Sequence, residues 1–356
     1  MKDLLSSIKP AVRQLQAYTL KHFEARVKIN QNENPFDMPA VVKAAVHKVM
    51  ADRAWCRYPA FVPTELATRL ARFANWRSDG VLVGNGSNEL IEAALMVTVE
   101  PGKRVVIPQP TFTLYQMLTV ILGGKPQPVP LTEALSFDVP RITEAAAQAD
   151  VTLLCCPNNP TGSMLSLDEM RSILKPARGL VIIDEAYHEF SRQSAVPLLN
   201  EFEHLVVLRT FSKAMSMAGL RVGYLLGHPT LVEQIAKAKL PYNLNIFSMA
   251  AAEAAVEHFG LLQPQIELLI QERERLLGQL QETRDVTAYP SQANFIAFKT
   301  QFPAARVFEA LYSNGILVRD ISRYPMLENF LRVSVGSPQE NDQFLEALRS
   351  FLATKL

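Results

Sequence analysis

The sequence predicts an α/β protein with a large domain built on a mostly parallel, helix-flanked sheet and a smaller α+β domain. Short apolar runs rich in β-branched residues recur between residues 81 and 226, and most lack the polar alternation of half-exposed strands. Such runs are typical of strands that are covered on both faces. Helical patterns lie between them, which favours a parallel sheet. The last third of the chain combines a long helical pattern with two short strand candidates, which indicates a separate α+β unit.

Residues 1–40 have no compact core pattern, and we expect an arm that packs against the small domain. The expected strands of the large sheet are 81–83, 104–107, 152–155, 180–183, 206–208 and 222–226. Helices are expected at 87–99 and 167–174. The second is preceded by Ser166 as N-cap, with Glu169 three residues later, which is the spacing of a capping box.

The C-terminal third is expected to begin with a long helix, at residues 263–282, that is rich in Glu, Arg and Leu. Strand candidates follow at 294–299 and 330–335, with a helix near 303–314 between them. We therefore expect the arm and part of the small domain at 1–40, the large domain at 41–262 and the small C-terminal domain at 263–356.

The composition of the 356-residue chain argues against several classes of partner. Lys plus Arg number 36 and Asp plus Glu 35, so no strong net charge favours nucleic acid or an anionic membrane. No apolar stretch approaches the roughly 20 residues of a membrane span, and the N-terminus lacks a signal-peptide pattern. Three cysteines cannot all pair, which favours a reduced, cytoplasmic protein. The six histidines show no ligand spacing, so we expect no metal site.

Polar or special residues follow five of the expected strands. These segments are 84–89, 108–115, 157–162, 184–187 and 210–223. Open α/β sheets bind ligands at the carboxyl ends of their strands, so these segments are expected to form one site.

The segment around Lys213 indicates the chemistry of that site. Thr210 and Ser212 provide hydroxyls close to the lysine, and Arg221 follows it by eight positions. Amine, hydroxyl and guanidinium groups together suit a phosphorylated carbonyl compound, and pyridoxal phosphate is the obvious candidate. Lys213 could hold its aldehyde as a Schiff base and carry a proton, and Asp184 could keep its pyridine nitrogen protonated.

The other strand ends offer further contacts for this cofactor. A phosphate dianion prefers backbone N–H groups at a helix N-terminus, and the expected helix opens with Gly86, Ser87 and Asn88. Phe112 could stack on the pyridine ring, and Asn159 and Tyr187 could donate to its phenolic oxygen.

Three motifs together resemble those of the fold type I aminotransferases. They are Pro157-Asn158-Asn159-Pro160-Thr161-Gly162, Asp184-Glu185-Ala186-Tyr187, and Ser212-Lys213 with Arg221. Within that superfamily the chain is most similar to the histidinol-phosphate aminotransferases. This resemblance rests on the segments 32–35, 57–59, 86–91, 110–112, 315–320 and 331–336.

The resemblance implies pyridoxal-phosphate-dependent transfer of the amino group of L-histidinol phosphate to 2-oxoglutarate, which gives imidazole acetol phosphate and glutamate in histidine biosynthesis. It also implies a homodimer in which Tyr58 reaches the cofactor phosphate of the neighbouring subunit. Arg332 matches the arginine that binds the anionic end of the substrate, while Arg319 and Tyr18 match groups that hold a phosphate. Asn34 is a further candidate for the substrate site.

Some positions depart from the family pattern, and other functions stay open. Asn88 stands where aspartate is usual, Phe112 where tyrosine is common, and Ala17 where proline often precedes the arm tyrosine. Arg332 lies in an apolar strand, so it either binds a ligand or belongs to an ion pair, and Arg319 could simply neighbour Asp320. The alternatives are an aromatic amino acid aminotransferase and a decarboxylase of a phosphorylated amino acid such as threonine phosphate. A regulator that senses the cofactor would need a DNA-binding segment, for which we find no basic helix-turn-helix pattern.

Overall fold

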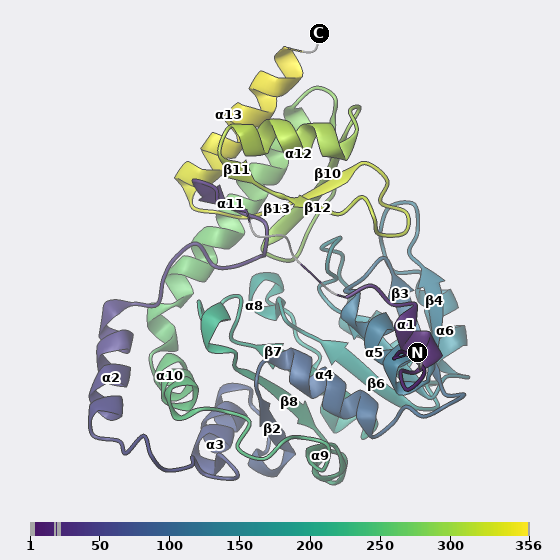
Figure 1. Ribbon diagram of the computed structural model, residues 1–356, viewed down its shortest axis with the longest axis vertical. Helices are drawn as coiled ribbons and strands as arrows, with labels where there is room; N and C mark the ends of the chain where they lie inside the picture. The colour runs from purple at the N-terminus through teal and green to yellow at the C-terminus, as the bar shows by residue number, and fades with distance from the viewer. Residues whose placement is uncertain (1–3, 18, 20–22, 355–356) are drawn as a thin grey trace.

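The computed structural model describes residues 4–17, 19 and 23–354. Figure 1 shows a large lower part, in which helices flank a twisted sheet, and a smaller upper part that contains the C-terminal helix. The large sheet has the strand order β2 (Val81–Gly84), β8 (Gly223–Gly227), β7 (Leu205–Thr210), β6 (Leu180–Asp184), β5 (Val151–Cys155), β3 (Arg104–Gln109) and β4 (Lys125–Pro130). β8 runs antiparallel to β2 and β7, and the remaining pairs are parallel. The predicted α/β class and mostly parallel sheet are therefore confirmed.

The helices of the large part lie between and around these strands. They are α2 (Ala40–Ala51), α3 (Thr64–Phe73), α4 (Ser87–Met96), α5 (Leu114–Leu122), α6 (Val139–Ala146), α7 (Leu167–Leu174), α8 (His188–Ser191), α9 (Pro229–Ala236) and α10 (Ile246–Glu257). Short 3-10 turns occur at Ser78–Gly80, Val196–Asn200, Ala218–Leu220 and Phe259–Leu261. α7 has the predicted bounds, and the Ser166 hydroxyl and the Glu169 carboxylate cap each other's backbone N–H groups. α4 ends three residues before its predicted end, where the β-branched residues 97–99 begin.

Strand β4 was missed because prolines occupy every second position from 126 to 130. The structure accommodates them at the edge of the sheet, where β3 is the one described strand that pairs with β4. The N–H of Lys125 donates to Lys103 O and the N–H of Leu131 to Gln109 O, so odd-numbered residues face β3. The prolines, at even positions, fall on the open side, where a missing N–H breaks no bond of the sheet.

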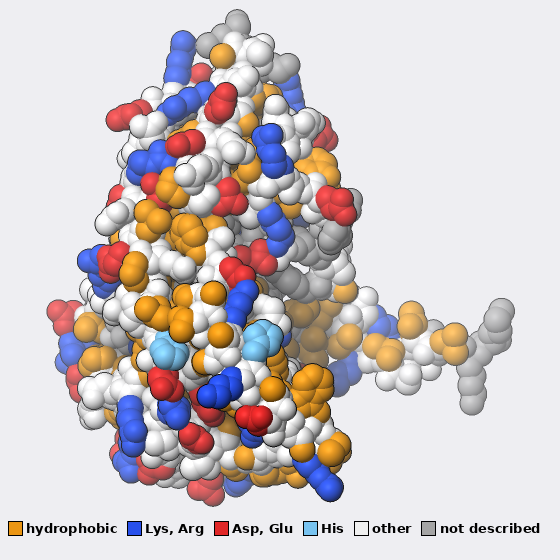
Figure 2. All heavy atoms as spheres, turned by 90° about the vertical axis from the view of Figure 1, so that its left-hand side faces the viewer, with side chains coloured by type: hydrophobic (Ala, Val, Ile, Leu, Met, Phe, Trp, Pro, Cys, Tyr) orange, Lys and Arg blue, Asp and Glu red, His pale blue; other side chains and the backbone are white. Residues whose placement is uncertain are grey.

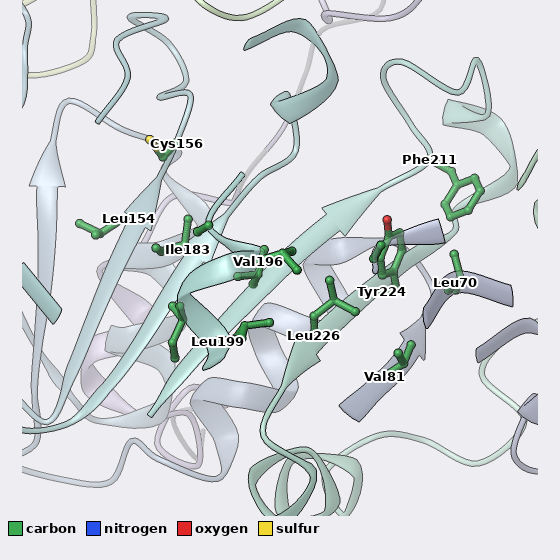
Figure 3. Close-up of a cluster of buried hydrophobic side chains, with 14 of the residues drawn as sticks. Leu70, Val81, Leu154, Cys156, Ile183, Val196, Leu199, Phe211, Tyr224 and Leu226 are labelled. Atoms are coloured by element: carbon green, nitrogen blue, oxygen red, sulfur yellow. The ribbon is translucent and has the colours of Figure 1, made fainter. Parts of the chain in front are cut away.

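The core of the large part occupies both faces of the sheet. Along β6, Val181 and Ile183 belong to one buried cluster, while Leu180 and Ile182 belong to another. Figure 3 shows the first cluster, in which Ile183 lies near Leu154 of β5. Burial on both faces explains why the strand has no polar alternation in its sequence.

The small part is built on an antiparallel sheet with the order β12 (Arg319–Asp320), β13 (Phe330–Ser334), β10 (Phe295–Thr300) and β9 (Val286–Ala288). The helices α11 (Gln263–Glu282), α12 (Ala304–Ser313) and α13 (Pro338–Ala353) pack around it. The predicted long helix has the observed bounds of α11, and both strand candidates are confirmed within one residue.

The N-terminal segment contacts both parts. β1 (Val27–Lys28) pairs in parallel with β11 (Ile316–Leu317), which attaches the segment to the small part as expected. α1 (Pro10–Arg13) instead lies beside α5, where the Lys9 ammonium donates to Ile121 O at 2.9 Å. The domain boundaries stay a prediction.

No helix within the described ranges is long and apolar enough to cross a membrane.

Candidate active site

The carboxyl ends of the central strands, the start of α4 and the small sheet surround one cavity of about 280 Å³. Twelve residues that were predicted to bind cofactor or substrate line it. They are Ser87, Asn88, Phe112, Asn159, Asp184, Tyr187, Thr210, Ser212, Lys213, Arg221, Arg319 and Arg332. The structure thus brings together groups from all five strand-end segments and from the small sheet.

Lys213 extends into this cavity from the loop after β7, and its ammonium group donates to Gln31 O at 2.9 Å. Burial lowers the pKa of Lys213 to about 7, and the positive charge of Arg332 acts in the same direction. Near neutral pH much of this side chain is therefore a free amine. A free amine is the form that can attack an aldehyde or accept a proton.

Asp184 is the last residue of β6 and is 3% exposed. One carboxylate oxygen, Oδ2, accepts a hydrogen bond from the Tyr115 hydroxyl at 2.7 Å, and the other accepts from the N–H of Ala186 at 3.1 Å. Burial raises the pKa of Asp184 to about 6, and the bond from Tyr115 opposes this shift. Above that pH the carboxylate is charged and can hold a protonated ring nitrogen.

The start of α4 and the side chain of Arg221 form a site that fits a phosphate group. Gly86 precedes the helix with φ +79°, and a Cβ atom built there would lie 2.7 Å from a terminal nitrogen of Arg221. Arg221 donates to the Ser212 hydroxyl at 2.9 Å, and the Thr210 hydroxyl lies 3.0 Å from the same oxygen. A guanidinium, two hydroxyls and a helix N-terminus converge here, which suits a dianion.

Two amide side chains orient the other polar groups of the cavity. Asn32 donates to the Tyr187 hydroxyl at 3.0 Å, and burial raises the pKa of Tyr187 well above its usual range, so this phenol stays protonated. Asn159 accepts from Arg332 at 2.5 Å through its oxygen. Its NH₂ group is therefore the part that can donate to a ligand, as the prediction requires.

Two arginines face the cavity from neighbouring strands of the small sheet. Arg319 of β12 is the direct register partner of Arg332 of β13. Arg332 donates to Asn30 O at 2.9 Å, and its guanidinium lies over the Phe295 ring at 5.1 Å. Arg319 lines the cavity, while the carboxylate of the adjacent Asp320 accepts from the N–H of Ser322 at 2.8 Å.

Three predicted residues within the described chain do not line the cavity: Gly86, which precedes α4 at the phosphate site described above, Asn34 and Tyr58. Asn34 lines an adjacent cavity, where its amide donates to Ala214 O and accepts from the N–H of Phe36, and its role in the substrate site stays a prediction. Tyr58 is 81% exposed and stacks on Tyr242 at 4.5 Å, away from the site of its own subunit. Tyr18 lies outside the described residues.

Sequence reasoning missed several residues that line the cavity. Tyr115 lies within the strand-end segment 108–115, but nothing in its spacing relates it to Asp184. Asn30 and Gln31 contribute carbonyl groups, which carry no side-chain signal. Tyr324 also lines the cavity, and no motif marks it.

Comparisons with known proteins agree with this geometry. Residues 25–348 match the family model described as aminotransferase class I and II. The chain is 37% identical over 351 residues to a histidinol-phosphate aminotransferase of Chlorobium phaeovibrioides, with 98% of this chain and 97% of the relative covered. It is 38% identical over 350 residues to that of Prosthecochloris aestuarii, with 97% and 98% covered.

A solved structure has the same fold. It is the histidinol-phosphate aminotransferase of Sinorhizobium meliloti in complex with pyridoxal-5'-phosphate. It superimposes with a TM-score of 0.88 at 22% identity over 99% of each chain. The family match over nearly the whole chain, together with the relatives, shows that this chain belongs to the class I and II aminotransferases.

Proposed function

We propose that this chain is a homodimeric, pyridoxal-phosphate-dependent enzyme that transfers the amino group of L-histidinol phosphate to 2-oxoglutarate. The products would be imidazole acetol phosphate and glutamate, in histidine biosynthesis. The full-length similarity to proteins named histidinol-phosphate aminotransferase supports this substrate.

The residues of the cavity fit pyridoxal phosphate. Bound at this site, the cofactor would supply an aldehyde that an amine can attack and a pyridinium ring that withdraws electrons. Lys213 provides the amine and moves a proton at its Nζ atom, and its low pKa makes both roles possible near neutral pH. Asp184 would keep a proton on the ring nitrogen through its buried carboxylate. Arg221 and the start of α4 would hold the phosphate.

The observation that favours a phosphorylated substrate is the pairing of Arg319 directly opposite Arg332 on neighbouring strands. Like charges placed opposite each other on paired strands repel, and a bound anion offsets that repulsion. Two guanidiniums suit a phosphate dianion better than a single carboxylate. The pair lies in the cavity that also contains Lys213, so a phosphorylated amine could place its anionic end on the arginines and its amino group near the reacting centre.

A panel of amino donors assayed with 2-oxoglutarate tests the proposal. L-histidinol phosphate should have the highest kcat/KM, above histidinol and phenylalanine. Arg319→Gln should reduce the preference for histidinol phosphate over histidinol by about tenfold, or about 1.4 kcal/mol. Arg323→Gln is the matched control because Arg323 is an exposed arginine on the turn after β12 that does not line the cavity. If histidinol phosphate were no better than phenylalanine, the roles of Arg319 and Tyr18 should be withdrawn.

The same two arginines would also suit a decarboxylase of a phosphorylated amino acid. Threonine phosphate incubated without an oxo acid separates the two reactions, because a decarboxylase would release carbon dioxide under these conditions. An aminotransferase would instead require the acceptor for turnover.

Exposed apolar side chains support the proposed homodimer. Trp55, Tyr58, Phe61 and Leu240 are each more than 60% exposed. The face that carries α2 and α10 has further hydrophobic side chains at its surface (Figure 2). Apolar surface of this extent is typical of a protein interface.

Subunit complementation tests whether Tyr58 acts across the interface. Lys213→Ala and Tyr58→Ala variants should each have little activity as homodimers. In a mixed dimer, the subunit that carries Tyr58→Ala keeps Lys213 and receives an intact Tyr58 from its neighbour. One site should then be active, whereas an inactive mixed dimer would place Tyr58 outside the neighbour's site.

A further inference from the structure

Tyr115 connects two of the groups assigned above to the cofactor. It lies in the first turn of α5 and is fully buried. Its hydroxyl donates to Asp184 Oδ2 at 2.7 Å. Its ring meets the Phe112 ring edge-on, with centroids 5.5 Å apart and an interplanar angle of 89°. A single side chain thus contacts both the carboxylate expected at the ring nitrogen and the aromatic ring expected on the ring face.

The hydrogen bond from Tyr115 gives the Asp184 carboxylate a second donor. Its other donor belongs to the loop that directly follows Asp184. The N–H of Ala186 holds Oδ1, but it lies only two residues from Asp184 on the same loop. Tyr115 reaches the second oxygen from a different element. A hydrogen bond to a charged acceptor is stronger than one between neutral groups, and a buried carboxylate without donors is costly.

The neighbouring Cys155 does not replace Tyr115 as the hydrogen-bond donor to Asp184. Its thiol donates to Pro157 O at 3.4 Å. Burial raises the pKa of Cys155 to about 12, so it stays a neutral thiol. The Tyr115 side chain also interacts with this thiol, but its hydroxyl hydrogen is donated to Asp184.

We propose that Tyr115 is a positioning residue for the cofactor: its hydroxyl holds Asp184 in place as a charged partner of the pyridine nitrogen, and its ring supports Phe112 against the ring face. This inference rests on the proposed function, because it requires pyridoxal phosphate in this cavity.

Loss of the hydroxyl should make the Asp184 carboxyl easier to protonate. A neutral acid does not stabilise a protonated ring nitrogen by charge, so cofactor affinity should fall. This loss of cofactor affinity should become larger as the pH is lowered toward the pKa of Asp184, which is about 6 in the intact protein. A purely structural role of the tyrosine would weaken the protein without this dependence on pH.

Tyr115→Phe tests the proposal because it keeps the ring contact with Phe112 and removes only the hydroxyl. The dissociation constant of pyridoxal phosphate, measured by equilibrium dialysis, should rise about tenfold at pH 8 and further at pH 6. Tyr224→Phe is the matched control, since it removes the same atom from another buried tyrosine, whose hydroxyl lies 3.5 Å from Arg209 instead. Thermal unfolding of each cofactor-free variant checks that it is folded.

A double-mutant cycle with Asp184→Asn provides the second test. If Tyr115 acts through the charge of Asp184, Tyr115→Phe should have no further effect on the dissociation constant in the Asp184→Asn background. Unchanged affinity in Tyr115→Phe, an equal loss in Tyr224→Phe, or an additive cycle would overturn the inference. Failure of the unmodified protein to bind pyridoxal phosphate would instead reject the proposed function.

Discussion

Replacing Lys213 by Met should stabilise the cofactor-free protein, and the gain should depend on pH. Met has nearly the same length and no charge, so Lys213→Met removes the cost of a buried ammonium. Burial lowers the pKa of Lys213 from 10.5 to about 7 in the folded state. The unfolded chain therefore binds more protons than the folded chain between these two values, and the stability of the native protein rises with pH across this window.

The size of the effect follows from the two pKa values of Lys213, 10.5 unfolded and about 7 folded. Each pKa unit corresponds to about 1.36 kcal/mol, so the ammonium costs about 4 kcal/mol at pH 7 and about 2 kcal/mol at pH 9. These are upper bounds because Lys213 is partly exposed to the cavity and water screens its charge. The apolar contacts of Met add the same amount to the free energy of unfolding at both pH values, because Met does not titrate. The difference between the two pH values, up to about 2 kcal/mol, therefore isolates the charge.

Urea unfolding of the cofactor-free proteins at equal concentration measures this difference. Equal concentration matters because dimerisation and bound ligand both shift apparent stability. Lys237→Met is the control, since Lys237 is an exposed lysine at the end of α9 and its charge remains in water. A gain in Lys213→Met that was the same at pH 7 and pH 9, or no larger than that of the control, would refute the reasoning.

Three other substitutions probe the packing and the binding groups. Arg209→Met leaves the Glu185 carboxylate buried without its ion-pair partner and should lower the free energy of unfolding by about 3–5 kcal/mol in a urea titration. Gly86→Ala places a Cβ atom 2.7 Å from Arg221 at a positive φ, so cofactor titration should show a dissociation constant raised by about tenfold or more. Arg332→Lys loses the paired guanidinium donors, and steady-state kinetics should show KM for the phosphorylated donor raised by about tenfold with a smaller change in kcat.

Most of the fold could be predicted because buried strands and long helices have strong local patterns. β5 and β6 are apolar at four of five positions, β7 begins with four apolar residues, and α11 extends over twenty residues. β4 could not be found, because its prolines are acceptable only at a sheet edge, and edge position is a property of the tertiary structure. β11 and β12 have two residues each, which is too short for any periodicity.

The cavity residues that could be predicted are those at the ends of strands. Asp184 and the Lys213 loop are covalently tied to β6 and β7, so the parallel sheet itself brings them together. Tyr115 could not be assigned in this way, because its contact with Asp184 joins residues 69 positions apart through the packing of α5. The orientation of Asn34 could not be predicted for a related reason: its motif indicates a site, but the backbone directs its amide toward Ala214 O.

The N-terminal segment links the arginine expected to bind the substrate with the reactive amine of Lys213. Three consecutive residues each contact a different functional group: Asn30 O accepts from Arg332, Gln31 O accepts from Lys213, and the Asn32 amide donates to Tyr187. Asn32 has φ +57°, a left-handed conformation that is uncommon outside glycine and that turns the chain at this point. The segment is attached to the small part through the pairing of β1 with β11. The arginine that would bind the anion therefore has its position relative to Lys213 set by these three residues.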